Sequence, residues 1–192
     1  MQFIGDFSVD PRICDQLIEL HRACDRQGLV KPGGMRRGDK VITDSAKKDS
    51  LDVAVDHIPE ALQERYGMAA YYAELQRCVA QYLEQHPLLS RVGTFRVTES
   101  PSIQHYRPGG GFKIEHFERA CLAASSRMLV WMTFLNDVTD GGGTRFTYQQ
   151  TTIDARKGRT LIWPTDFTHT HVGVVSPSQH KYIITGWFNY VA

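Results

Sequence analysis

The strongest indication of the fold is a stretch near the C-terminus, residues 181–188, which has the sequence KYIITGWF. Its β-branched and aromatic residues are typical of a β-strand, in which successive side chains point to opposite faces. One face would carry Lys181, Ile183, Thr185 and Trp187. A lysine is costly to bury among apolar neighbours unless it meets an anion. The stretch therefore predicts either a lysine that binds a carboxylate or a lysine that faces solvent.

Seven further segments in the second half of the chain also predict strands. They are short, several of them alternate with period two, and turns rich in glycine or proline separate them. They span residues 94–98, 102–106, 127–135, 144–148, 151–155, 159–163 and 169–175, and the first stretch extends to 181–190. Eight short strands at fairly regular spacing indicate a sandwich, a jelly roll or a small barrel.

The first half of the chain predicts mainly helix. Asp10 and Pro11 supply an N-cap acceptor and a proline suited to the first helical position, and an apolar stripe follows as far as Cys24. A second helix is expected from about residue 59 to residue 85, again with an apolar stripe.

Between these helices, residues 28–57 predict a long, polar and charged connection. Such a segment is either a solvated loop or a lid over a site. We expect a single domain over residues 1–192. Its helical part would cover 1–90 and its β core would cover 91–192.

Composition excludes several classes of protein. The chain has 192 residues with 22 basic and 21 acidic side chains, a net charge of +1, which gives no support for nucleic-acid binding by phosphate neutralisation. The longest apolar run, residues 128–135, is far shorter than the roughly 20 residues of a membrane span. The N-terminus has no signal-peptide pattern, and the four cysteines are scattered. We therefore expect free thiols, a cytoplasmic location and no membrane or nucleic-acid partner.

Three histidines and one glutamate have spacings that suit metal binding. His116 precedes Glu118 by two residues, and His169 precedes His171 by two. Residues two apart on a strand share a face, so either pair could point into one interior. Two histidines and one carboxylate leave open positions on a metal ion, as in non-haem Fe(II) oxygenases. A hydrogen-bonded His116–Glu118 pair without a metal explains the same spacing.

Several motifs in sequence order resemble one known family. They are FSVDPRICDQLI at 7–18, IQHYRPGGGF at 103–112, SRMLVWMTFLN at 126–136, GGGTRF at 141–146 and GRTLIWP at 158–164, followed by His171, Lys181 and Trp187. Together they resemble the iron(II)- and 2-oxoglutarate-dependent dioxygenases, specifically the prolyl 4-hydroxylase-like branch. The resemblance covers nearly the whole chain.

The resemblance implies an α+β fold with a mainly β core, a double-stranded β-helix (jelly roll) flanked by N-terminal helices. It implies three iron ligands, namely His116, Glu118 and His171, with His171 preferred to His169 for its spacing to Lys181. It implies that Lys181 pairs with the distal carboxylate of 2-oxoglutarate, with Tyr106 and Thr185 as hydrogen-bonding helpers. It also places Arg127 and Trp187 near the substrate as candidate catalytic residues. For Arg127 a solvated strand end is the alternative, and for Trp187 it is plain core packing.

One position departs from the family pattern, because the usual aspartate is replaced by Glu118. The extra methylene affects how the carboxylate reaches a metal, and thus the metal affinity and rate. Alternation puts the neighbouring Glu115 on the opposite face, so it is a poor substitute. A carboxylate at this position also argues against the related halogenases.

The function implied by the resemblance is hydroxylation of an unactivated C–H bond, with release of succinate and CO2. The cofactors would be Fe(II) and 2-oxoglutarate as cosubstrate, and ascorbate is left open as an additional one. The substrate could be a prolyl residue of a peptide or protein, or a small molecule, and the oligomeric state is not predicted. Two alternatives are a non-catalytic jelly-roll module that binds or senses metal and 2-oxoglutarate, and a metal enzyme of another class on the same architecture.

Overall fold

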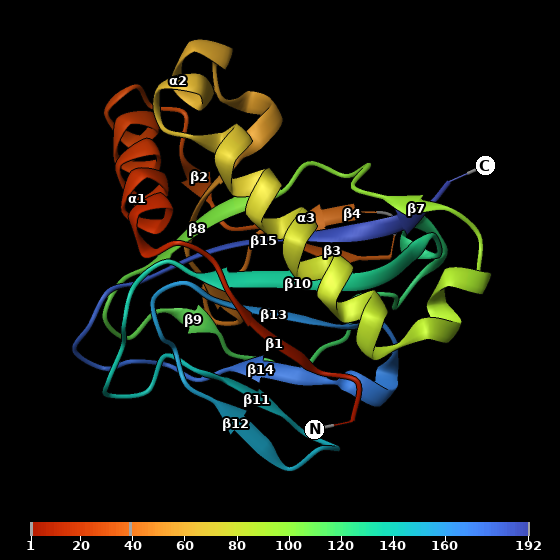
Figure 1. Ribbon diagram of the computed structural model, residues 1–192. Helices are drawn as coiled ribbons and strands as arrows, with labels where there is room; N and C mark the ends of the chain where they lie inside the picture. The colour runs from red at the N-terminus through yellow and green to blue at the C-terminus, as the bar shows by residue number, and fades with distance from the viewer. Residues whose placement is uncertain (1, 39, 192) are drawn as a thin grey trace.

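An antiparallel sheet runs through the centre of the computed structural model, which describes residues 2–38 and 40–191 (Figure 1). Its strands lie in the order β1 (Gly5–Ser8), β13 (Arg159–Pro164), β10 (Arg127–Phe134), β15 (Lys181–Tyr190), β8 (Ser102–Tyr106), β6 (Leu51–Ala54) and β2 (Lys31–Pro32). A short strand, β7 (Phe95–Arg96), pairs with the end of β15. We call this the main sheet.

A smaller sheet packs against one face of the main sheet. It contains β12 (Thr151–Ile153), β11 (Thr144–Phe146) and β14 (His171–Gly173), in that order. Two further strand pairs are separate from both sheets, β3 (Met35–Arg37) with β4 (Lys40–Ile42) and β5 (Lys48–Asp49) with β9 (Gly111–Phe112). The two facing sheets form the predicted jelly roll, and all eight strands expected in the second half of the chain are present.

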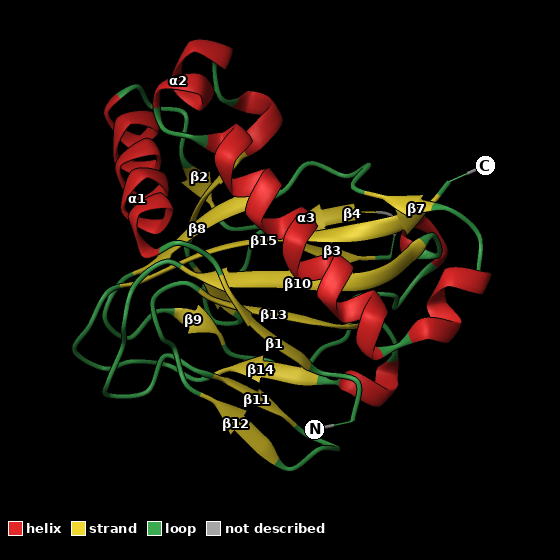
Figure 2. Ribbon diagram, viewed as in Figure 1, coloured by secondary structure: helices red, strands yellow, loops and turns green. Residues whose placement is uncertain are grey.

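Helices cover the other face of the main sheet (Figure 2). They are α1 (Pro11–Arg26), α2 (Glu60–Arg65) and α3 (Met68–Gln85), with short 3-10 turns η1 (Val55–His57), η2 (Pro87–Arg91), η3 (Leu122–Ala124) and η4 (Phe167–His169) elsewhere. The Asp10 side chain caps α1 by accepting from the backbone N–H of Arg12, as the sequence predicted. The buried faces of α1 and α3 pack on the sheet and complete one hydrophobic core.

Strand β10 separates two hydrophobic cores. Leu129 and Trp131 point to the helices, whereas Val130, Met132 and Phe134 point to the smaller sheet. Because both faces are covered, all eight residues of the strand are buried. This explains why the sequence shows a continuous apolar run there instead of an alternating one.

Two expectations for the first half of the chain were wrong. Residues 28–57 are not an unstructured loop but contain β2 to β6, and β6 pairs with β8 on one side and with β2 on the other in the main sheet. The helix expected over 59–85 is interrupted at Gly67, whose φ of 75° lies in the left-handed region that favours glycine. In the described part of the chain, no helix has the length and hydrophobicity that a membrane crossing requires.

A buried polar contact fixes α3 on the main sheet. The hydroxyl of Tyr71 lies 2.9 Å from that of Thr133 on β10, and Thr133 lies 2.7 Å from the hydroxyl of Thr160 on β13. All three residues are fully buried. Each hydroxyl therefore replaces water for its neighbour, and the contact determines how α3 sits on the strands.

Replacing Tyr71 by phenylalanine should lower the free energy of unfolding by about 1 kcal/mol, the usual contribution of a buried hydrogen bond. Urea denaturation measures this. The matched control is Tyr72→Phe, because the half-buried Tyr72 hydroxyl makes no hydrogen bond to any described residue. Equal stability of the two variants would contradict the importance of the Tyr71 contact.

Candidate functional site

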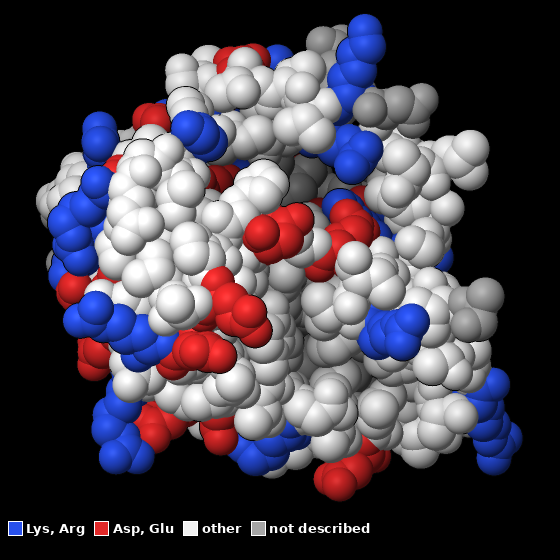
Figure 3. Space-filling model, turned by 90° about the horizontal axis from the view of Figure 1, so that it is seen from above, with Lys and Arg blue, Asp and Glu red and all other residues white. Residues whose placement is uncertain are grey.

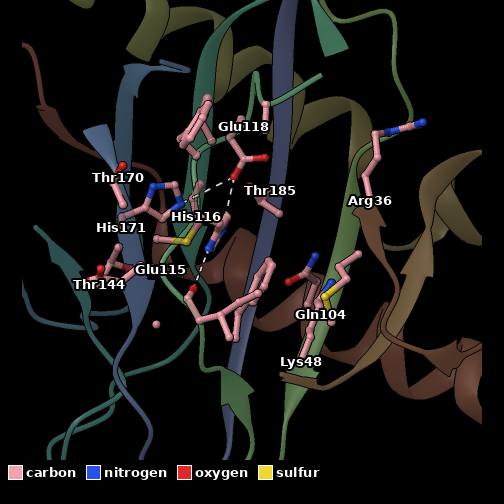
Figure 4. Close-up of a pocket in the computed structure, with 18 of the residues that line it drawn as sticks. Arg36, Lys48, Gln104, Glu115, His116, Glu118, Thr144, Thr170, His171 and Thr185 are labelled. Carbon is pink, nitrogen blue, oxygen red and sulfur yellow. Dashed lines mark hydrogen bonds and ion pairs between the residues drawn. The ribbon is translucent and has the colours of Figure 1, made fainter. Parts of the chain in front are cut away.

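A pocket of about 600 Å³ lies between the two sheets (Figure 4). Strands β10 and β15 supply one wall, while β11 and β14 of the smaller sheet supply the opposite wall. Four alternate residues of β15 line the pocket, namely Lys181, Ile183, Thr185 and Trp187. The alternation predicted from the sequence is therefore confirmed, and the alternative of a solvent-facing Lys181 is wrong.

Three side chains converge on one point of this pocket. The Nε2 atoms of His116 and His171 each lie 3.5 Å from Oε1 of Glu118, and the three candidate ligand atoms are all within 4.8 Å of one another. Figure 4 shows the two imidazoles and the carboxylate pointing toward each other. They form the only such cluster of histidine, cysteine or acidic side chains within residues 2–38 and 40–191.

Backbone carbonyls orient both imidazoles. Nδ1 of His116 lies 3.0 Å from the carbonyl oxygen of Ile114, and Nδ1 of His171 lies 2.9 Å from that of His169. A carbonyl oxygen only accepts, so each Nδ1 carries the ring proton. A neutral ring then presents an Nε2 lone pair to the centre of the cluster, as a metal-binding histidine requires.

The charges in the cluster also suit a divalent cation. Burial raises the pKa of Glu118, but its interactions with His116 and His171 outweigh burial and hold the pKa well below its usual range. Burial, together with the neighbouring His116, lowers the pKa of His171. Two imidazoles with one carboxylate are a donor set that fits Fe(II).

The backbone around His116 differs from the expected strand. His116 forms one isolated bridge with His171, through N–H···O contacts of 3.0 and 2.9 Å, and the N–H of Glu118 turns to the carbonyl of Thr165 at 3.1 Å. The segment is thus anchored to the smaller sheet at His116 and to the end of β13 at Glu118. The two side chains still converge, although no regular strand carries them.

His169 lies outside the cluster. It ends the 3-10 turn η4 and its Nε2 is 3.2 Å from the carbonyl of Gln2, so the expectation that His169 and His171 could share one interior was wrong. Strand β14 begins only at His171. The nearby Glu115 also points elsewhere, because its carboxylate accepts from Thr147 at 2.9 Å and pairs with Arg145.

Lys181 carries a buried amino group at the inner end of the pocket. It is 6% exposed, and Nζ lies 4.7 Å from the centre of the Tyr106 ring. Burial lowers the pKa of Lys181 to about 8. No carboxylate among the described residues forms an ion pair with it. An unpaired buried ammonium is unfavourable, so this position favours an anionic ligand.

The two hydroxyls expected to assist Lys181 already donate to protein oxygens. Tyr106 donates to Oε1 of Gln104 at 2.6 Å, and Thr185 donates to the carbonyl of Trp131 at 2.8 Å. Each would have to rotate before it could donate to a ligand. Thr144, which the sequence reasoning missed, is buried at the pocket wall, and its hydroxyl makes no hydrogen bond to the residues that the structure describes.

Arg127 and Trp187 lie next to Glu118. Arg127 is 6% exposed, so it is not a solvated strand end. A β-bulge between Arg127 and Leu129 explains why the Arg127 side chain is buried. Regular alternation would send Arg127 to the helices with Leu129, but the extra residue turns its side chain to the pocket. Glu99, which no sequence signal indicated, pairs with it there.

The segment 28–57 also contributes to the pocket. Arg36 and Gly38 on the β3–β4 hairpin line it, as does Lys48, which is buried and pairs with Asp52 at 2.7 Å. The polar composition of this segment therefore reflects pocket-lining structure, not only solvated chain.

Over the face of the molecule seen in Figure 3, Lys and Arg side chains are interspersed with Asp and Glu.

Comparisons with known proteins agree with this geometry. The family model of the 2OG-Fe(II) oxygenase superfamily matches residues 101–189, which include all three clustered side chains and Lys181. No curated protein matches the chain.

Many solved structures resemble the chain. The viral collagen prolyl hydroxylase of Paramecium bursaria Chlorella virus-1, in its 2OG complex, has a TM-score of 0.68 at 17% identity, covering 99% of this chain and 97% of that one. A Pseudomonas putida prolyl-4-hydroxylase has a TM-score of 0.69 at 17% identity, covering 97% and 92%. A Trichoplax adhaerens prolyl hydroxylase, bound to a hypoxia inducible factor peptide, has a TM-score of 0.67 at 14% identity, covering 97% and 84%.

These neighbours share the fold of this chain, and the family match covers its β core. The chain therefore has a prolyl 4-hydroxylase-like fold, and its residues 101–189 are similar to the 2OG-Fe(II) oxygenase superfamily.

Proposed function

We propose that His116, Glu118 and His171 hold Fe(II), and that Lys181 binds the distal carboxylate of 2-oxoglutarate. The observation that carries this is the convergence of three metal-type donors, within 4.8 Å of one another, in the same pocket as an unpaired buried ammonium. Iron with 2-oxoglutarate and O2 supplies the oxidising power for hydroxylation of an unactivated C–H bond. Three protein ligands leave positions for the cosubstrate and for O2.

The protein's own part in this reaction is orientation and exclusion of water. Lys181 would neutralise the distal carboxylate and fix the direction of the cosubstrate in the pocket, and Thr144 offers it a free hydroxyl. Apolar side chains of β10 and β15, such as Val130, Met132 and Ile183, line the rest of the wall. They keep competing water away from the reacting atoms.

The substrate that we propose is a prolyl side chain in a peptide or protein. The Trichoplax adhaerens neighbour is bound to a peptide fragment. Val41 on the pocket-lining β3–β4 hairpin and Leu122, which follows the pocket-lining Cys121, are strongly exposed. Exposed apolar side chains at this place suit an extended peptide better than a free amino acid.

The β3–β4 hairpin is a candidate lid. Gly34, Arg36 and Gly38 line the pocket from this side, and the hairpin pairs only with itself within the described residues. Closure over a bound substrate would exclude water from the reacting atoms.

The cytoplasmic location stays a prediction, supported by the four free thiols.

A succinate-release assay with Fe(II) and 2-oxoglutarate tests the proposed substrate. Proline-containing peptides should stimulate succinate formation and gain one oxygen atom by mass spectrometry, whereas free proline and other free amino acids should not. Stimulation by free amino acids alone would contradict the peptide assignment.

His171→Ala should abolish tight binding of Mn(II), used as a redox-stable substitute for Fe(II), because one of three ligands is lost. Electron paramagnetic resonance of free Mn(II) measures the affinity. His169→Ala is the matched control, since His169 is also buried but contacts Gln2 instead of the cluster. Loss of binding in His169→Ala but not in His171→Ala would refute the ligand set.

Lys181→Ala should raise the dissociation constant of 2-oxoglutarate by at least about 30-fold, because a buried charge pair loses roughly 2–5 kcal/mol when one partner is removed. Isothermal titration of the Mn(II)-loaded protein measures this. Lys181→Arg should restore part of the affinity because it keeps the cation. An unchanged constant in Lys181→Ala would exclude Lys181 as the carboxylate partner.

The lowered pKa of Lys181 predicts that the affinity for 2-oxoglutarate depends on pH. Its pKa of about 8 in the ligand-free protein means that the ammonium is progressively lost above that pH, so each binding event must then take up a proton. The dissociation constant of 2-oxoglutarate should be flat below pH 7.5 and rise by up to about tenfold per pH unit above 8. Lys181→Arg should remove this rise, because arginine stays charged.

A further inference from the structure

The two oxygens of the Glu118 carboxylate have different surroundings. Oε1 faces the histidines, at 3.5 Å from Nε2 of both His116 and His171. Oε2 points away from them and accepts a hydrogen bond of 3.1 Å from Nε1 of Trp187. It also lies 3.5 Å from Nη1 of Arg127. One oxygen is therefore available to a metal, and the other is occupied by protein donors.

Trp187 and Arg127, the two donors to Oε2, are themselves fixed by contacts with each other and with Glu99. The Arg127 guanidinium lies over the Trp187 ring, 3.6 Å from its centre. The Glu99 carboxylate accepts two hydrogen bonds from the guanidinium, of 2.7 and 2.5 Å. Asn189 in turn donates to Glu99 at 2.8 Å. Arg127 also donates to the backbone carbonyl of Glu118 at 3.2 Å.

Strand pairing brings this group together. Arg127 on β10 is opposite Asn189 on β15, beside the bulge that turns Arg127 to the pocket. Trp187 lies two residues before Asn189 and shares its face of β15. The group is thus built on the two central strands of the main sheet, which are rigid elements.

We propose that Trp187 and Arg127 are positioning residues that fix Glu118, so that it offers only Oε1 to the metal. This inference rests on the proposed ligand set. Glutamate has one more rotatable bond than the aspartate usual in the family, so it needs an anchor to keep one geometry. The N–H of Trp187 supplies that anchor, and the Glu99-held Arg127 keeps the indole in place.

The same geometry gives a reason for the extra methylene. Glu118 spans the distance from its backbone to both the histidine pair and the Trp187 N–H. An aspartate at this position would be shorter and could not satisfy both contacts from the same backbone. In this chain, therefore, the family's usual residue should be the poorer ligand.

Trp187→Phe tests the proposal, because it removes the N–H while keeping an aromatic ring under Arg127. We expect the dissociation constant of Mn(II), measured by electron paramagnetic resonance without 2-oxoglutarate, to rise by about 10- to 100-fold, the usual effect of losing a group that orients a metal ligand. The Co(II) absorption spectrum should also change, since a released carboxylate can bind through both oxygens.

Trp131→Phe is the matched control. Trp131 is fully buried on the neighbouring strand, and its Nε1 has no hydrogen-bond partner among the described residues. Its replacement should leave the Mn(II) affinity and the Co(II) spectrum as in the wild type. A Trp187→Phe protein that matches this control in both measurements would overturn the positioning role.

Glu118→Asp gives a second test that does not depend on replacing a large side chain. The proposal predicts weaker Mn(II) binding for this variant, and little further loss when Glu118→Asp is added to Trp187→Phe, because the anchor is then already absent. Equal or tighter Mn(II) binding by Glu118→Asp would overturn the proposal. Failure of the wild-type protein itself to bind Mn(II) would instead reject the ligand set on which it rests.

Discussion

Alternation along β10 and β15 is the constraint on which the rest of the structure depends. These two strands pair at the centre of the main sheet, and each sends side chains in turn to the helices and to the pocket. The helix-facing residues build the larger core. The pocket-facing residues of β15 place a cation, a hydroxyl and an indole in one row, at positions 181, 185 and 187. A slip of one residue in this pairing would exchange the two sets.

The charges of the site are balanced in two separate places. At the end that holds the histidine–glutamate cluster, Glu118 is ionised between two imidazoles, and Arg127 beside it is neutralised by Glu99. At the other end, Lys181 has no anionic partner among the described residues, and burial lowers its pKa. A divalent cation at one end and a carboxylate at the other would balance the remaining charges. This complementarity is that expected of a pocket for a metal and a dicarboxylate.

Much of this arrangement was predictable from the sequence, because strand patterns and ligand spacings are local. The eight strands of the second half and the start of α1 follow from period and capping, whereas the pattern alone left open whether Lys181 faces the pocket or the solvent. The preference for His171 over His169 came from the family resemblance, and the geometry of the cluster agrees with it. Features that depend on distant partners were missed. Strand β6 forms because β8 and β2 are available to pair with it, and Arg127 faces Glu118 only because of a bulge that no local pattern indicates.

A crystal structure of the protein with Mn(II) and 2-oxoglutarate, obtained without O2, most directly tests whether this pocket is the metal and cosubstrate site. We expect one Mn(II) bound by Nε2 of His116, Nε2 of His171 and Oε1 of Glu118, with the distal carboxylate of 2-oxoglutarate on Nζ of Lys181. A metal held by other side chains, or a cosubstrate whose distal carboxylate lies away from Lys181, would contradict it.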